Sequence, residues 1–203
     1  MNKESTEWRY RIFRSVKEED VIVDAGACIG KISAVFADIA KKGMVVAVEP
    51  VYENYLVILG SILQNQYKNI VPVFAGFSNK GGISKIYVGN YCESYSSWWM
   101  KSFEDGPTIV RPMLAITYDD LIGMLNINRV DFLKVDVNGA ELALFEGMTN
   151  VLPKRIFLED STKMKPMTGF HDNVEFHNSL LDNLKAKGYK ITEEFKYWYL
   201  FER

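Results

Sequence analysis

The ten residues V-I-V-D-A-G-A-C-I-G, at positions 21–30, decide the fold of this chain. Three β-branched apolar residues open the stretch and predict a short buried strand. Gly26 and Gly30 follow, and apolar residues then recur at helical spacing over 32–39, which predicts a helix. A turn between strand and helix lies at the carboxyl edge of an open α/β sheet, where ligands bind. We expect Gly26 to let backbone approach the ligand and Gly30 to let the helix pack tightly on the strand.

The spacing of this turn indicates its ligand. From Asp24 to Gly30 it reads D-x-G-x-x-x-G, which is neither the dinucleotide pattern G-x-G-x-x-G nor a phosphate loop. Asp24 would repel a pyrophosphate but suits a ligand with an ammonium group. S-adenosylmethionine carries an amino group and a sulfonium charge and no phosphate, and the motif resembles the first motif of class I S-adenosylmethionine-dependent methyltransferases. A tight turn in another kind of α/β protein is the alternative.

A second acidic residue ends the next predicted strand, M-V-V-A-V-E-P at 44–50. Glu49 can accept hydrogen bonds from both ribose hydroxyls of a bound nucleoside. Pro50 then turns the chain into a helix. Phe77, just beyond a strand predicted over 70–75, is either an adenine contact or a core residue. The residues expected to bind the cofactor are Asp24, Gly26, Ala27, Gly30, Glu49, Pro50 and Phe77.

A second informative stretch, V-D-F-L-K-V-D-V-N-G-A-E-L, occupies 130–142. It predicts a central strand with Lys134 and Asp136 at its carboxyl end, on the same face because they are two residues apart. Strand ends of a parallel sheet meet at one edge, so we expect both side chains to face the cleft of Asp24 and Glu49. A structural ion pair is the alternative.

Together these motifs resemble the FkbM family of methyltransferases. V-D-A-G-A-C-I-G with E-P, then D-F-L-K-V-D-V-N-G-A-E and L-F-E-G-M, are similar to the family pattern over about residues 21–160. The resemblance implies an α/β, class I methyltransferase (Rossmann-like) fold, with a mostly parallel seven-stranded sheet and helices on both faces. It also implies methyl transfer, typically to a hydroxyl oxygen. Asn138 stands where the family usually has glutamate, which bears on acceptor choice or rate.

The end of the chain predicts an antiparallel hairpin. Strands predicted over 189–192 and 197–201 are joined by only four residues, 193–196, and so short a link forces antiparallel pairing. Pro72 gives its strand an edge position, because proline cannot donate to a ladder.

We expect a single domain over 1–203 with two accessory parts. Residues 1–20 hold a short cap helix over 6–16. Residues 90–112 form an aromatic-rich, irregular insertion that we interpret as a lid or an acceptor-binding loop. A subunit contact is the alternative for this insertion.

Methyl transfer to a hydroxyl needs alignment and a proton acceptor. The candidates for this base are Asp136, Glu159 and His171. Asp136 is preferred because its strand ends beside the predicted methyl group, whereas His171 is a lone histidine in a predicted loop. Lys134 is expected to hold an acceptor carboxylate or to stabilise an alkoxide. Asp136, Glu159 and Asp160 lie near enough for a metal, but no ligand spacing requires one.

The composition of the chain limits the classes of binding partner and metal site that we expect. The formal net charge of −2 gives no electrostatic reason to expect nucleic acid or an anionic membrane. Two cysteines and two histidines make neither a disulfide framework nor a zinc site. The chain shows no signal peptide and no membrane span, so we expect a cytoplasmic protein. Homo-oligomerisation is left open.

The sequence therefore predicts an S-adenosylmethionine-dependent methyltransferase that acts on a hydroxyl of a small molecule or sugar. Sugars, lipids, polyketides and small phenols all stay open as acceptors. Two alternatives stand beside it. One is a non-catalytic module that binds S-adenosylmethionine, suggested by Asn138. The other is a dinucleotide-dependent oxidoreductase on a related fold.

Overall fold

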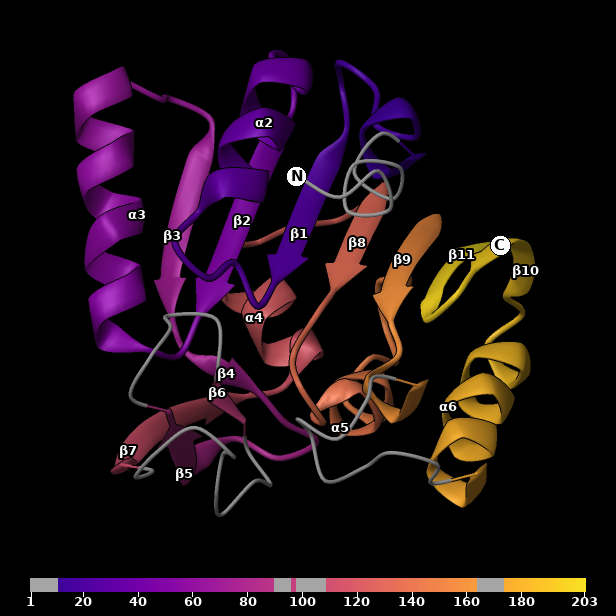
Figure 1. The fold of residues 1–203 in the computed structure, drawn as a ribbon. Coiled ribbons are helices and arrows are strands. Elements are labelled where there is room, and N and C mark those ends of the chain that lie inside the picture. The colour runs from indigo at the N-terminus through magenta and orange to yellow at the C-terminus, as the bar shows by residue number, and fades with distance from the viewer. Residues whose placement is uncertain (1–10, 90–95, 98–108, 164–173) are drawn as a thin grey trace.

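A seven-stranded sheet with the order β10-β11-β9-β8-β1-β2-β3 forms the centre of the protein (Figure 1). The computed structural model describes residues 11–89, 96–97, 109–163 and 174–203. The neighbouring strands β9, β8, β1, β2 and β3 run parallel to one another, and β11 runs antiparallel to both β9 and β10. The strands are β1 (Val21–Ala25), β2 (Met44–Glu49), β3 (Ile70–Phe74), β8 (Phe132–Val135), β9 (Arg155–Glu159), β10 (Lys190–Phe195) and β11 (Trp198–Glu202).

The predicted edge strand and the predicted hairpin are both confirmed. β3, which carries Pro72, lies at one edge of the sheet, and the β10–β11 hairpin lies at the other. The link of the hairpin is shorter than expected, because Phe195 already pairs with Trp198 and leaves only two residues between the strands. Lys196 takes a left-handed conformation in this turn, with φ 56°.

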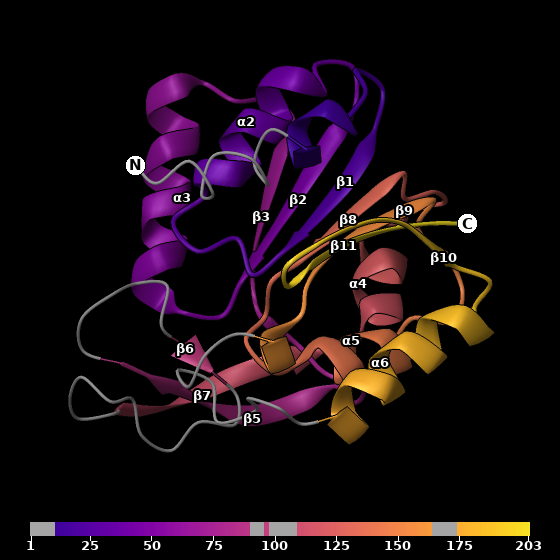
Figure 2. The ribbon, with the colours of Figure 1, turned by 45° about the vertical axis from the view of Figure 1, so that its right-hand side comes forward.

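Helices cover both faces of the sheet, as predicted. In Figure 2, α2 and α3 lie on one side and α4, α5 and α6 on the other. They are α2 (Lys31–Ile39), α3 (Tyr52–Asn65), α4 (Tyr118–Met124), α5 (Glu141–Glu146) and α6 (Val174–Ala186), with a 3-10 turn, η1 (Ser161–Lys163). Within the described ranges, no helix combines the length and the apolar character that a bilayer crossing needs.

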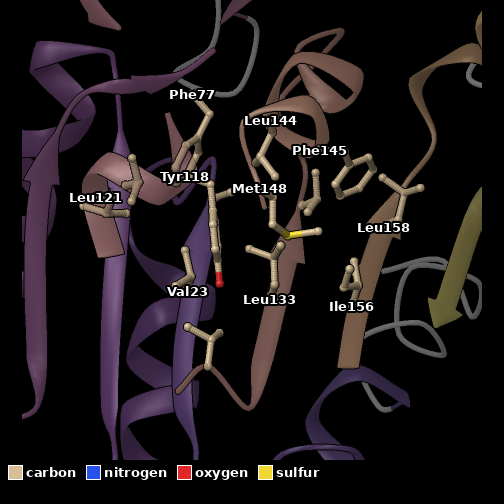
Figure 3. Packing of buried hydrophobic residues seen from close by; sticks show 14 of the residues in the cluster. Val23, Phe77, Tyr118, Leu121, Leu133, Leu144, Phe145, Met148, Ile156 and Leu158 are labelled. Atoms are coloured by element: carbon tan, nitrogen blue, oxygen red, sulfur yellow. The ribbon is translucent and has the colours of Figure 1, made fainter. Parts of the chain in front are cut away.

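Successive residues of the central strands point to opposite faces of the sheet and pack into a hydrophobic core on each face. Ile22 packs with Phe36 of α2, whereas its neighbour Val23 packs with Tyr118 of α4 on the opposite face. Figure 3 shows the second of these cores between the strands and α4 and α5. Residues 11–14 are helical and Ile12 is fully buried in the first core, which fits the cap helix as far as the described residues reach.

A separate four-stranded sheet with the order β4-β7-β5-β6 lies beyond the carboxyl ends of β1–β3 (Figure 1). Its strands are β4 (Gly76–Phe77), β5 (Gly82–Val88), β6 (Ser96–Ser97) and β7 (Ile109–Ile116). Val51, which precedes α3, packs with Ile86 and Met113 of this sheet, and Arg111 pairs with Glu53. The second sheet is therefore fixed to the connection that follows Glu49.

This sheet corrects the predicted insertion. The interpretation of 90–112 as irregular is wrong at 96–97 and 109–112, which belong to β6 and β7. Residues 90–95 and 98–108, which include all five aromatic residues of the insertion, lie outside the described residues, and with them the predicted lid. The sequence did not predict β7 for two reasons. The strand is stabilised by pairing with β5, whose paired residues lie 21 or more positions earlier in the chain. It also contains Pro112, and proline is rare inside strands.

Candidate active site

The glycine turn lies between the ends of β2 and β8. The N–H groups of Gly26 and Ala27 both donate to the carbonyl of Val48, at 3.1 and 3.0 Å. Gly26 has φ 75°, and a Cβ there would lie 1.9 Å from the carbonyl oxygen of Asp136. Only glycine fits here, because the main chain at Asp136 leaves no room for a side chain. The sequence had instead suggested that a ligand needs this space.

Gly30 also has a different neighbour from the predicted one. Its φ is 79°, and an added Cβ would lie 3.0 Å from Cγ1 of Ile58 on α3. The residue thus lets two helices approach each other, rather than a helix and its strand. Ala27 is buried beside the same Ile58.

Glu49 points back at the glycine turn from the end of β2. Its Oε2 accepts a hydrogen bond from the Cys28 N–H at 2.8 Å. Its Oε1 accepts from the Val51 N–H at 2.9 Å and from the Asn54 side-chain amide at 3.1 Å. Burial raises the pKa of Glu49 to about 7, against the opposing effect of these donors. The carboxylate is thus held in place by neutral groups.

Asp24 and Lys134 form an ion pair inside the protein. Lys134 Nζ lies 3.1 Å from Asp24 Oδ1 and 3.4 Å from Asp136 Oδ2, and it donates to the Gly26 carbonyl at 2.8 Å. Ser33 donates to the other Asp24 oxygen at 2.6 Å. Burial lowers the pKa of Lys134, but Asp24 and Asp136 outweigh it and hold the pKa above its ordinary value. The structural alternative for Lys134 is therefore supported.

This geometry bears on two predicted roles. The ammonium group of Lys134 donates to the Gly26 carbonyl and lies within 3.4 Å of one oxygen each of Asp24 and Asp136, so its surroundings already hold two carboxylates. Contact with an acceptor carboxylate is thus not what this arrangement favours. Asp24 has no exposed surface, so it meets a buried lysine rather than the ammonium group of a ligand.

Asp136 and Glu159 lie together at the ends of β8 and β9. The side chain of Asp136 is 30% exposed, whereas Glu159 is buried. Burial, the charge of Asp136 and a hydrogen bond with Asp136 all raise the pKa of Glu159. Burial beside a second carboxyl group therefore favours the neutral form of Glu159.

The turn after Asp136 explains the unusual Asn138. Asn138 and Gly139 have φ 47° and 100°, and the Ala140 N–H closes the turn on the Val137 carbonyl at 3.4 Å. Asn-Gly is the pair that best adopts two successive positive φ angles. The Gly139 N–H then donates to Glu141 at 3.1 Å, and burial raises the pKa of Glu141 to about 7.

A histidine that the sequence analysis did not single out completes this edge. His177 Nδ1 on α6 lies 2.6 Å from Asp160 Oδ2, directly beyond β9. Asp160 is fully buried, and its Oδ1 accepts from the N–H and the hydroxyl of Thr162 at 3.0 and 2.6 Å. A signal was present in the sequence: His177 shares a helical stripe with Leu180 and Leu184 and so had to face the sheet.

The remaining predicted residues are spread more widely. Phe77 is 3% exposed and packs against Tyr118 in the core, which supports the core interpretation of that ring (Figure 3). Pro50 is partly buried next to Glu49. His171 lies outside the described residues. The sequence analysis also did not identify Asn54 and Ser33, the side chains that hold Glu49 and Asp24.

In the part of the chain that the structure describes, no group of three or more histidine, cysteine, aspartate or glutamate side chains is arranged to hold a metal ion. The acidic side chains of this edge are engaged instead with backbone N–H groups, with one another and with Lys134.

Comparisons with known proteins address the family and the fold. The profile of the methyltransferase FkbM domain matches residues 24–191, most of the chain. No curated protein sequence matches. An FkbM methyltransferase structure from Methylobacillus flagellatus matches 92% of this chain with a TM-score of 0.56 and 17% identity. This chain covers only 44% of that protein's length.

Two further structures have the same fold. A putative rRNA methylase from Clostridium thermocellum matches all of this chain and 96% of its own, with a TM-score of 0.58 and 12% identity. Aeropyrum pernix fibrillarin, solved with natively bound S-adenosyl-L-methionine, matches 92% of this chain and 67% of its own, with a TM-score of 0.52 and 14% identity. The predicted fold class and family are confirmed, and so is the cofactor of that family. The chain belongs to the FkbM family of S-adenosylmethionine-dependent methyltransferases.

Proposed function

We propose that this protein transfers a methyl group from S-adenosylmethionine to a hydroxyl oxygen of a small molecule or a sugar. The observation that carries the proposal is the placement of two acidic side chains on either side of the glycine turn. Glu49 contacts the turn at Cys28, and the main-chain carbonyl of Asp136 lies against Gly26. The Asp136 carboxylate lies 3.4 Å from Lys134 Nζ, which itself binds the Gly26 carbonyl. A ligand across this turn meets a carboxylate at each end.

The chemistry of this edge suits S-adenosylmethionine. The oxygens of Glu49 accept three hydrogen bonds from the chain, which leaves capacity on Oε2 for a ribose hydroxyl. Asp136 supplies a partly exposed negative charge for a cation. When bound, S-adenosylmethionine supplies an electrophilic methyl group, whose bond to sulfur breaks, with its electron pair left on sulfur, as the bond to the acceptor oxygen forms.

The same edge does not favour a pyrophosphate. Among the described strand-end residues, the positive charge comes from Lys134, which is buried between two carboxylates. This argues against the dinucleotide-dependent oxidoreductase. The net charge of −2 supports a small acceptor rather than nucleic acid.

We assign Asp136 a role different from that of the predicted base. Its carboxylate lies 3.4 Å from the ammonium group of Lys134, so it is already engaged with a buried cation rather than free to take a proton from the acceptor. Asp136 is instead placed to attract the positive charge of the bound cofactor. Burial and the neighbouring Asp136 raise the pKa of Glu159 and favour its neutral form, so we do not assign Glu159 as the base.

The proposal is tested by calorimetric titration with S-adenosylmethionine, S-adenosylhomocysteine and NAD. We expect the two adenosyl compounds to bind and NAD not to bind. Glu49→Ala should weaken binding about 10- to 100-fold, because a hydrogen bond to a charged group contributes roughly 1.5–3 kcal/mol. Glu53→Ala, which removes an exposed carboxylate on α3, is the matched control and should leave binding unchanged.

An acceptor screen over sugars, phenols and hydroxylated lipids then tests the reaction, with S-adenosylhomocysteine release as the readout. Turnover on a hydroxyl acceptor supports O-methylation. Tight cofactor binding without turnover on any acceptor class would favour the non-catalytic module, and binding of NAD alone would overturn the proposal.

A further inference from the structure

His177 and Asp160 form an acid–base pair at this edge that the roles above do not use. Asp160 has no exposed surface, and Thr162 occupies its Oδ1 with two hydrogen bonds. Its Oδ2 faces His177 Nδ1 at 2.6 Å. Since a carboxylate only accepts hydrogen bonds, Nδ1 carries the hydrogen, and in the neutral ring the lone pair is therefore on Nε2.

The exposure of His177 leaves Nε2 available. Its side chain is 21% exposed, and among the described residues no hydrogen-bond partner is found for Nε2. A buried carboxylate that fixes the tautomer of a partly exposed imidazole is the arrangement that makes histidine a general base. Asp160 also offsets the charge of the imidazolium that forms when Nε2 takes a proton.

The pair lies at the same edge as the proposed cofactor site. β9 lies next to β8, and Glu159 at its end contacts Asp136. Asp160 is the next residue, so His177 lies one strand further from the glycine turn than Asp136. With the ribose at Glu49, as proposed above, the side of the turn toward β8 and β9 is the one left for the acceptor.

We infer that His177 is the catalytic base for the acceptor hydroxyl and that Asp160 positions it. The inference rests on the proposed methyl transfer. As the oxygen bonds to the methyl carbon, the O–H bond breaks, its electron pair stays on oxygen and the proton moves to Nε2. The proton then passes from the partly exposed imidazole to water, which restores the neutral ring.

Histidine suits this task better than the carboxylates nearby. A neutral imidazole is a much stronger proton acceptor than an ionised carboxylate. The ionisable groups around it are Asp160 beyond β9, Tyr199 of β11 at 6.2 Å between ring centroids, and Glu141 of α5, whose charge reaches Asp160.

The first test needs no acceptor. Diethyl pyrocarbonate modifies unprotonated histidine, and the difference between the wild type and His177→Gln isolates the reaction of Nε2 in the full chain. We expect His177 to react and saturating S-adenosylhomocysteine to slow that reaction about tenfold or more, as its occupancy of the site requires. A reaction rate that S-adenosylhomocysteine leaves unchanged would overturn the placement.

The second test uses the hydroxyl acceptor returned by the screen. His177→Gln and His177→Ala should lower kcat about 10²- to 10⁴-fold, with cofactor affinity within about twofold. Added imidazole should restore part of the rate of His177→Ala, which a purely structural residue would not allow. Lys185→Gln, an exposed change on the same helix, should have no effect.

The outcomes separate the two proposals. A wild-type protein that does not bind S-adenosylmethionine removes the proposed function. A protein that binds it and turns over, but retains more than about a tenth of its kcat as His177→Gln, removes only the role of His177.

Discussion

Asp24 and Glu49 end two neighbouring strands, and both are buried, yet the protein holds them in different ways. Asp24 is paired with the ammonium group of Lys134 at 3.1 Å. Glu49 is held by two backbone N–H groups and an amide, and among the described residues no lysine or arginine forms an ion pair with it. The charge of Asp24 is therefore balanced by Lys134 inside the protein. The ionisation of Glu49, whose pKa is about 7, changes with pH near neutrality and with the binding of a ligand. An acidic residue at a strand end can stabilise the fold or bind a ligand. An ion pair with a buried lysine favours the first role, and hydrogen bonds from neutral donors favour the second.

The largest effect should follow removal of the cation. Lys134→Met leaves Asp24 buried with an uncompensated charge, which should lower the free energy of unfolding by about 3–5 kcal/mol in urea denaturation. Lys154→Met is the matched control: Lys154 is 67% exposed and pairs with Asp131 at 2.7 Å, so its loss should cost less than about 1 kcal/mol. Equal effects from the two variants would contradict the assignment of Asp24 as scaffold.

Glu141 is a buried carboxyl group with a raised pKa, and its replacement by a neutral side chain should increase the free energy of unfolding, whereas Lys134→Met should decrease it. The pKa of Glu141 is about 7 in the folded protein and about 4.3 when unfolded, so its contribution to stability is full below pH 4.3 and is lost as the pH rises through 7. Glu141→Gln should therefore raise the free energy of unfolding by about 2 kcal/mol at pH 8, with little gain at pH 4. The exposed Glu146→Gln on the same helix is the control, and a loss of stability at pH 8 would count against this account.

Glu49 should make cofactor binding depend on pH. A ribose hydroxyl prefers the carboxylate, so affinity should fall as the pH drops through the Glu49 pKa of about 7. We expect S-adenosylhomocysteine to bind about tenfold more weakly at pH 6 than at pH 8, by calorimetry. Glu49→Ala should remove this dependence. A variant that keeps the full pH dependence would assign it to another group.

The smallest effect should come from Asp136, which is the most exposed of these acids. Asp136→Asn should weaken S-adenosylmethionine about fivefold, because a partly exposed charge attracts a cation modestly. S-adenosylhomocysteine lacks the sulfonium charge and should change by less than about twofold. Asp182→Asn, an exposed change on α6, is the control. Equal weakening of both ligands would argue that Asp136 acts through structure rather than charge.

Much of the fold could be predicted because it is encoded locally. The strand, glycine turn and helix of 21–39 and the strand at 132–135 appear where the hydrophobic pattern placed them. β7 could not be identified in this way, because a strand with proline in it is recognised by its partner and not by its own composition.

The candidate site also combines features that the local sequence predicts with features that depend on tertiary contacts. Residue types at strand ends indicated an acidic edge and the family. The sequence could not show that Gly26 is needed against Asp136, because that contact joins two strands over 100 residues apart in the chain.

The sequence by itself determined the order of elements, the acidic residues that end the strands and the family to which the chain belongs. Periodicity and short motifs carry that information within a few turns of the chain. Only the tertiary structure decided that Lys134 neutralises Asp24 and leaves Glu49 to the ligand, and that His177 meets Asp160. These choices depend on a few ångströms between side chains that the packing of separate strands and helices brings together.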